Sequence, residues 1–183
     1  MHKRFLTPFS PRRRRVRLEV VNRTRGRLPR RGLFQRAAEM ALAGAAGRGP
    51  LATTLVCVGQ REMAELNARF HRRRRPTDVL SFDYGDREWG AGDRRRPGRR
   101  SRTPNPEPRT PPLVGEVVIC RPVAVREARR RRLSVEGELL LYALHGWLHL
   151  AGYDDRTAGR RRRMRAAEGR ILRRLGFAPK AQP

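Results

Sequence analysis

The stretch HGWLHLAGYDD, residues 145–155, places two histidines four positions apart and ends with two carboxylates. On an α-helix, side chains at this spacing lie on one face, so the imidazoles of His145 and His149 can bind the same metal ion. Gly152 permits the positive φ that ends a helix and turns the chain back. A carboxylate beyond that turn can supply a third ligand and leave a fourth position for water, as in catalytic zinc sites. The pattern therefore indicates a catalytic metal centre.

The histidine spacing has a second explanation. Two histidines on an apolar helix are often hydrogen-bonded residues of the core, so the spacing alone is a weak signal. The turn and the carboxylates that follow it favour the metal centre. The metalloprotease motif HExxH does not describe the site, because Gly146 stands where that motif has its glutamate base.

The elements that position these residues are strands and helices with clear hydrophobic periods. Apolar residues in alternation predict strands, and apolar residues recurring every three or four positions predict helices. Ser134 is the predicted N-cap of the helix that carries the histidines. We expect strands at 16–22, 51–59, 79–84 and 113–120, and helices at 28–46, 61–70, 122–132, 135–152 and 157–175. This order predicts an α+β fold, a single domain with a small mixed four-stranded sheet packed with about five helices.

Three segments fall outside this pattern. Residues 1–15 read as a basic N-terminal tail and residues 178–183 as a C-terminal tail, which leaves residues 16–177 as the domain. Within the domain, residues 85–112 are rich in Gly, Pro and Arg and offer almost nothing to bury. We expect this segment to be a flexible basic loop.

The composition indicates a polyanionic partner. The chain has 44 basic and 17 acidic residues and a formal net charge of +27. Nucleic acid fits this charge better than a membrane, because no long apolar or amphipathic anchor accompanies it. Cys57 and Cys120 lie in apolar runs and are expected to be buried free thiols of a reducing compartment. Because no apolar segment could span a bilayer and the N-terminus lacks a signal-peptide core, we expect a cytoplasmic location.

The histidine stretch is similar to HGxLHLxGYDH, the mark of the YbeY endoribonucleases, which are bacterial metalloproteins of rRNA maturation. It differs from that motif at the last position. Three further segments resemble the family in the same order: PTDVLSF (76–82), LVGEVVIC (113–120) and MRAAEGRILRRLGF (164–177). The resemblance covers about residues 16–177. It implies one Zn²⁺ per chain, held at the positions of the three motif histidines, which are His145, His149 and Asp155 in this chain.

Asp155 is the first departure from the family motif. Carboxylate oxygen is an accepted zinc ligand, and sets of two histidines and one carboxylate occur in working zinc hydrolases. We therefore expect an altered site that keeps its metal and tolerates harder ions such as manganese. Asp154 matches the family's own aspartate and is the less favoured ligand. Glu116 is either a hydrogen-bond partner of a ligand histidine or a plain acid of an edge strand.

The basic stretch HRRRR, residues 71–75, is the second departure. The family has an arginine implicated in RNA cleavage a few residues before PTDVLSF, and counting back places it at His71, with Arg72 beside it. A guanidinium there would hold a phosphate through two donors, whereas a histidine would act as a general acid or base. The arginines expected to bind the RNA backbone electrostatically are Arg73, Arg74 and Arg75.

The resemblance implies a metal-dependent endoribonuclease for single-stranded RNA, acting at the 16S rRNA 3′ end and in ribosome quality control. The implied partners are ribosomal RNA, the small ribosomal subunit and assembly factors. One alternative is a catalytically weak RNA-binding assembly factor, which would keep the fold and the basic surface with an altered metal site. Another is a metal-dependent hydrolase of small molecules, which leaves the charge of +27 unexplained.

Overall fold

A computed structural model describes residues 15–45, 51–84 and 113–177 of the chain. The strands are β1 (Val16–Asn22), β2 (Leu51–Val58), β3 (Val79–Asp83) and β4 (Leu113–Cys120). The helices are α1 (Arg31–Ala41), α2 (Gln60–His71), α3 (Arg121–Arg131), α4 (Val135–Leu150) and α5 (Ala158–Arg174), with a 3-10 turn, η1, at Leu42–Gly44. The predicted C-terminal tail, the predicted basic loop and all but the last residue of the predicted N-terminal tail lie outside the described residues.

The four strands form one mixed sheet in the order β1-β2-β4-β3. β1, β2 and β4 run parallel, and β3 pairs antiparallel with β4 at the edge of the sheet. The register places Ser81 of β3 beside Val117 of β4, and Phe82 beside Glu116. Together with the five helices of the described ranges, this sheet confirms the predicted α+β class.

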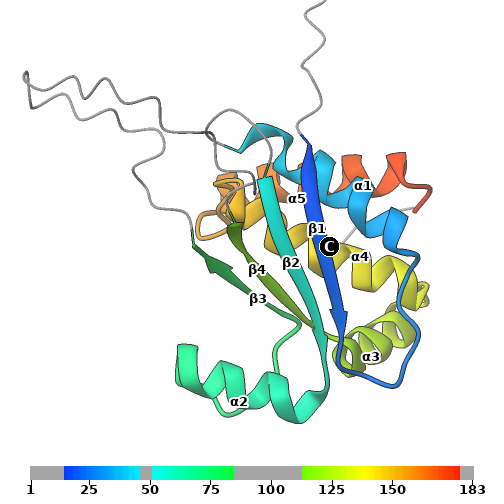
Figure 1. The fold of residues 1–183 in the computed structure, drawn as a ribbon, viewed down its shortest axis with the longest axis vertical. Helices are drawn as coiled ribbons and strands as arrows, with labels where there is room; N and C mark the ends of the chain where they lie inside the picture. Colours follow the sequence, from blue (N-terminus) through cyan, green and yellow to red (C-terminus); the bar gives the residue numbers. More distant parts are fainter. Residues whose placement is uncertain (1–14, 46–50, 85–112, 178–183) are drawn as a thin grey trace, which may run out of the picture.

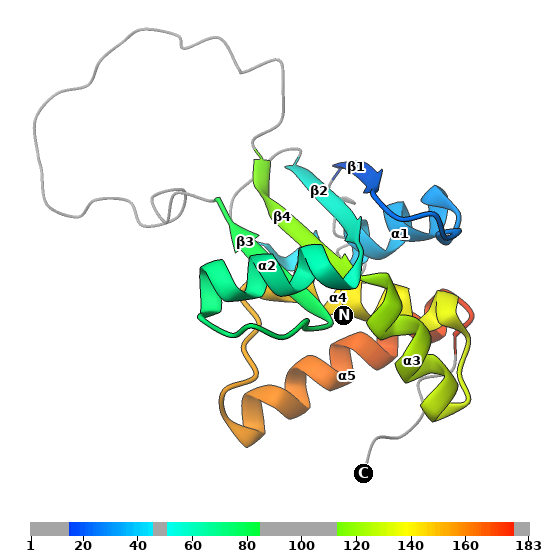
Figure 2. The ribbon, with the colours of Figure 1, turned by 90° about the horizontal axis from the view of Figure 1, so that it is seen from below.

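α4 is the central helix of the fold. It lies against the sheet, and α5 lies on its far side (Figure 1 and Figure 2). Because α4 is covered on both sides, it is apolar around most of its circumference. Its fully buried Trp147 donates from the indole Nε1 to Thr53 Oγ1 of β2 at 3.2 Å, which fixes the helix on the sheet. The buried residues of α4 include Leu139, Leu140, Ala143, Leu144, Trp147 and Leu148.

The observed elements differ from the predicted ones mainly at helix ends. The helix predicted at 28–46 begins at Arg31, because Leu28 precedes a proline and residues in that position avoid helical backbone. It ends at Ala41 and continues only as η1. The predicted N-cap of α4 is confirmed, because Ser134 Oγ accepts a hydrogen bond from the Gly137 N–H at 3.0 Å.

Gly146 lets α4 approach the sheet closely. A Cβ added there would lie 2.5 Å from Val117 Cγ1 and 3.0 Å from Ser81 Oγ. We expect Gly146→Ala to lower the free energy of unfolding by about 1–3 kcal/mol, because overpacking forces the helix away from the strands. The matched control is Gly159→Ala, since nothing lies within 4 Å of a Cβ at that helical position. Urea unfolding measures both variants, and equal stability would contradict the close contact.

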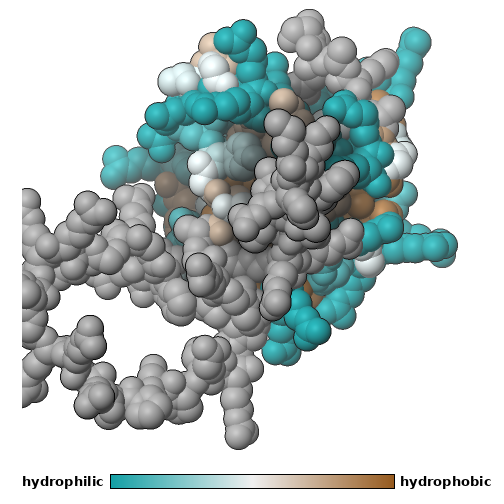
Figure 3. Space-filling model, turned by 90° about the horizontal axis from the view of Figure 1, so that it is seen from above, coloured by the Kyte–Doolittle hydropathy of each residue, from teal (hydrophilic) through white to brown (hydrophobic). Residues whose placement is uncertain are grey.

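The described surface is strongly basic. Figure 3 shows hydrophilic side chains over most of the described part of one face. On α5 alone, the exposed arginines are Arg160, Arg161, Arg162, Arg163, Arg165, Arg170, Arg173 and Arg174. Cys57 and Cys120 are buried and unpaired, as predicted. Among the described helices, none has the length and apolar character needed to cross a membrane.

Candidate metal centre

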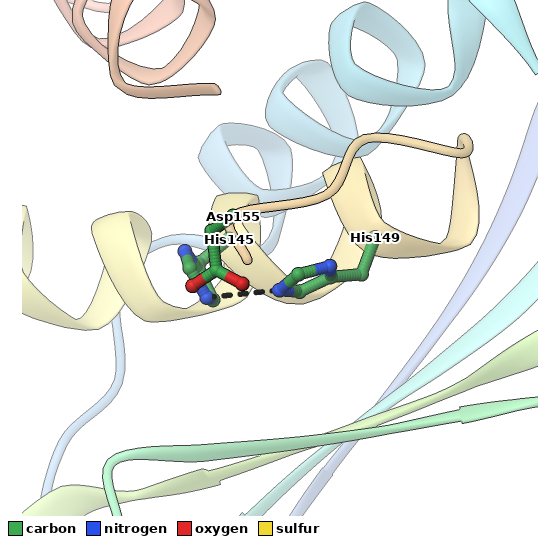
Figure 4. A group of neighbouring side chains, drawn as sticks. All are labelled: His145, His149 and Asp155. Atoms are coloured by element: carbon green, nitrogen blue, oxygen red, sulfur yellow. Dashed lines mark hydrogen bonds between the residues drawn. The ribbon is translucent and has the colours of Figure 1, made fainter. Parts of the chain in front are cut away.

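His145 and His149 lie one turn apart on α4, and their imidazole rings lie edge to face (Figure 4). Their Nε2 atoms are 3.1 Å apart, and the ring planes are inclined by 85°. Two nitrogens bound to one tetrahedral zinc ion, each about 2.0–2.1 Å from it, lie roughly 3.3 Å apart. The spacing of the two Nε2 atoms therefore suits adjacent corners of a zinc coordination tetrahedron.

Hydrogen bonds at the other ring nitrogens set the tautomer of both histidines. His145 Nδ1 lies 2.8 Å from Oε1 of Glu168 on α5, and His149 Nδ1 lies 3.0 Å from the Tyr153 carbonyl oxygen. A carbonyl and an ionised carboxylate can only accept, so each Nδ1 carries the proton. Nε2 is then the nitrogen of each ring that is left to bind a proton or a metal ion, and the two Nε2 atoms face each other. This arrangement is typical of histidines that bind metal.

The turn after α4 places both the Tyr153 carbonyl and Asp155. Gly152 has φ +90°, its N–H donates to His149 O, and the Tyr153 N–H donates to Leu148 O, both at 2.9 Å. These two bonds form the Schellman motif, which ends a helix at a glycine. The predicted helix stop is thereby confirmed. The reversed chain brings the Asp155 carboxylate to the two imidazoles (Figure 4).

Asp155 completes a set of three donor groups. One ligand atom from each of His145, His149 and Asp155 lies within 4.8 Å of the others, and all three residues are partly buried. Imidazole nitrogen and carboxylate oxygen are both zinc ligands, and carboxylate oxygen also suits manganese. The donor set therefore fits one divalent cation, with three protein groups and a coordination position left over.

Asp154, the neighbouring acid, is engaged elsewhere. Its Oδ1 accepts from the Arg156 N–H at 2.9 Å, and its Oδ2 accepts from Arg160 Nη1 at 2.6 Å. The backbone bond from Arg156, followed by the bond from Arg160, lowers the pKa of Asp154. The geometry agrees with the expectation that Asp155 is the carboxylate that meets the histidines.

Glu168 is a site residue that the sequence reasoning missed. It is 8% exposed and accepts the Nδ1 proton of His145. Burial lowers the pKa of His145, but the hydrogen bond and charge of Glu168, with the charges of Asp78 and Asp155, outweigh burial and raise that pKa. The sequence did carry a signal, because Glu168 is an acid on the apolar side of its helix, four positions after the buried Met164.

Glu116 does not fill that role. It lies on β4 between Gly115 and Val117, and both of these positions face α4. Because side chains alternate along a strand, Glu116 points to the opposite face, away from α4 and its histidines. β4 also lies between β2 and β3, so Glu116 is not on an edge strand either.

The predicted catalytic and RNA-binding residues lie at the end of α2. His71 is its last residue, and Arg72 follows in the left-handed conformation, with φ 57°. The exposed side chains of this segment are those of His71, Arg72, Arg73, Arg74 and Arg75. Among the described residues, no hydrogen bond or ion pair joins them to the histidine pair. Their roles stay predictions.

Comparison with known proteins gives matches over most of the chain. Residues 28–176 match the family model described as Endoribonuclease YbeY. Endoribonuclease YbeY of Bordetella pertussis is 36% identical over 157 residues, which are 83% of this chain and 86% of the relative. Endoribonuclease YbeY of Alkalilimnicola ehrlichii is 34% identical over 161 residues, 88% of this chain and 87% of the relative.

A solution structure of a Thermotoga maritima protein covers 92% of this chain and 99% of its own, at 19% identity and a TM-score of 0.49. The assignment rests on the sequence matches, which span most of the chain and agree with the resemblance in its motifs. The chain belongs to the YbeY endoribonuclease family.

Proposed function

We propose that this chain is a metal-dependent endoribonuclease that cleaves single-stranded RNA. One observation supports the proposal most directly: the Nε2 atoms of His145 and His149 converge at 3.1 Å while acceptors hold both Nδ1 protons. Two ring nitrogens at that distance need a cation between them, either a proton, as in a hydrogen bond, or a metal ion. The Asp155 carboxylate places a negative charge beside the two imidazoles, and this charge favours the binding of a divalent cation there.

The proposed metal ligands are His145, His149 and Asp155. When bound, a divalent ion supplies polarisation of a phosphoryl oxygen and activation of water. Glu168 and the Tyr153 carbonyl keep the two imidazoles in the tautomer that binds metal, and they fix the ring orientations before the ion arrives.

The proposed RNA-binding groups are the exposed side chains at the end of α2. The Arg72 guanidinium can hold a phosphate through two N–H donors, and the His71 imidazole can move a proton to or from a reacting oxygen. Arg73, Arg74 and Arg75 attract the RNA backbone through charge, without reading sequence.

For the substrate, we propose ribosomal RNA, with action at the 16S rRNA 3′ end and in ribosome quality control. The small ribosomal subunit and its assembly factors are the proposed partners, and the cytoplasm the proposed compartment. Family membership supports this assignment, and the net charge of +27 supports a polyanionic partner. The catalytically weak assembly factor is not favoured, because it gives no reason for three metal-ligand groups to converge.

Removal of metal should abolish RNA cleavage. Protein purified without chelator should carry one divalent ion per chain by elemental analysis. Dialysis against a chelator should reduce cleavage of a single-stranded oligoribonucleotide to the level of buffer alone, because the histidine pair then has no ion to share. Addition of Zn²⁺ or Mn²⁺ should restore it, since the donor set suits both ions. A duplex of the same sequence tests the preference for single strands.

The double variant His145→Ala/His149→Ala is the control for contaminating nucleases, because it should stay inactive at any metal concentration. Metal-free protein that cleaves as fast as the loaded protein would refute the role of the metal. A chain that binds both metal and RNA but never cleaves would favour the assembly-factor alternative.

A further inference from the structure

Phe70 and Tyr84 are the exposed large hydrophobic residues of the described ranges, at 50% and 52% exposure. Both lie at β3. Phe70, on α2, packs edge-on against Phe82 of β3, with ring centroids 4.7 Å apart. Tyr84 follows Phe82 by two positions, so it lies on the same face, and its N–H extends the ladder by donating to Val114 O at 3.1 Å. Phe70, Phe82 and Tyr84 thus form one partly exposed row, which we call the aromatic platform.

The aromatic platform and α4, the helix that carries the histidine pair, lie on opposite faces of β3. Ser81 lies against Gly146 of α4, which is the neighbour of His145. Because side chains alternate along a strand, Phe82 points to the other face. β3 is the edge of the sheet in the described part of the chain. A strand of RNA that crosses this edge can therefore meet the platform on one face and the histidine pair on the other.

Arginines border the aromatic platform. The Arg69 guanidinium lies 5.5 Å from the centre of the Phe70 ring. Four more arginines follow at 72–75, all of them exposed. Buried Asn67 donates from Nδ2 to Arg75 O at 2.6 Å, which holds the segment that carries these arginines against the end of α2, next to Phe70 in the sequence.

We propose that the aromatic platform stacks bases of single-stranded RNA while the neighbouring arginines hold its phosphates. Proteins that bind single strands without sequence preference combine these two features. Glu116 shares this face, and the arginines at 69 and 72–75 outweigh its charge. A second copy of the chain is a poor occupant, because each copy carries a charge of +27. The proposal rests on the proposed function for the identity of the ligand as RNA.

Phe70→Leu and Tyr84→Leu test the stacking, because leucine keeps an apolar side chain but removes the flat ring. Affinity for a single-stranded oligoribonucleotide, measured by fluorescence anisotropy with metal chelated, should fall about tenfold in each variant. Affinity for an abasic oligonucleotide of the same length should stay unchanged, because that probe has no base to stack. Thermal unfolding of each variant verifies that the fold is kept.

Arg74→Gln is the matched variant for charge. It should weaken binding of both probes and lower the slope of log affinity against log salt by about one unit. The leucine variants should leave that slope unchanged, since they remove no charge. A Phe70→Trp variant gives a direct signal: its fluorescence should be quenched by the base-containing probe and not by the abasic one.

Equal affinity of the wild type and both leucine variants for the base-containing probe would overturn the platform and leave metal-dependent cleavage untouched. Leucine variants that change the sedimenting mass of the protein, but not its RNA affinity, would also overturn it, in favour of a protein interface. A tenfold loss in both variants, combined with a wild type that shows no metal-dependent cleavage, would support the platform and refute the proposed function.

Discussion

Asp155→Ala should bind Zn²⁺ at least about 10- to 100-fold more weakly than the wild type, because loss of a ligand's hydrogen-bond partner alone lowers metal affinity by that much. Loss of a ligand itself should have no smaller effect. The variant keeps two imidazoles but removes the carboxylate that lies within 4.8 Å of them. Competition with a chromophoric chelator measures the affinity without any need for RNA.

Asp154→Ala is the matched control, and its zinc affinity should stay close to that of the wild type. It removes the adjacent carboxylate, which is bonded to Arg156 and Arg160. Equal losses in the two variants would assign the effect to the conformation of the loop after α4. A larger loss in Asp154→Ala would reverse the ligand assignment.

The elements of this fold could be predicted because their hydrophobic periods are distinct. β1 alternates the buried Val16 and Leu18 with the exposed Arg17, as a strand with one wet face does. The ends of α4 could be predicted because Ser134 and Gly152 act through local hydrogen bonds. Strand order could not be read in this way. It depends on pairing between distant segments, such as β2 with β4, and local pattern carries no information on such partners.

Part of the candidate site could likewise be predicted from local sequence, and part could not. The histidine pair could be predicted, since a spacing of four positions is a local property of a helix. Spacing alone left two carboxylates, and only the family resemblance selected Asp155. Glu168 lies 23 positions after His145, and no local rule joins the two residues. Their contact arises because α5 packs along α4, so tertiary packing decides which acid meets the histidine.

Glu168→Leu should lower the affinity for Zn²⁺ by about 10- to 100-fold, because metal-binding histidines depend on the partner of their second ring nitrogen. In the wild type, the Glu168 carboxylate accepts the Nδ1 proton of His145 at 2.8 Å, so Nε2 is the nitrogen that the neutral ring offers to a metal ion. Without this acceptor, part of the population carries the proton at Nε2, which cannot bind metal. Glu168→Gln keeps an acceptor but loses the charge, so its loss should lie at the lower end of the range.

Nitrogen NMR of the metal-free protein separates this positioning role from a structural one. The wild type should show His145 mainly as the Nδ1–H tautomer, and Glu168→Leu should show a mixture. Folding should tolerate the change, because a buried carboxylate replaced by a leucine of similar size removes a desolvated charge. Glu65→Gln is the control, since that exposed acid on α2 pairs with Arg61 and, among the described residues, has no contact with the histidines. If Glu168→Leu kept both the tautomer and full zinc affinity, the orientation of His145 would have to come from packing within α4 alone.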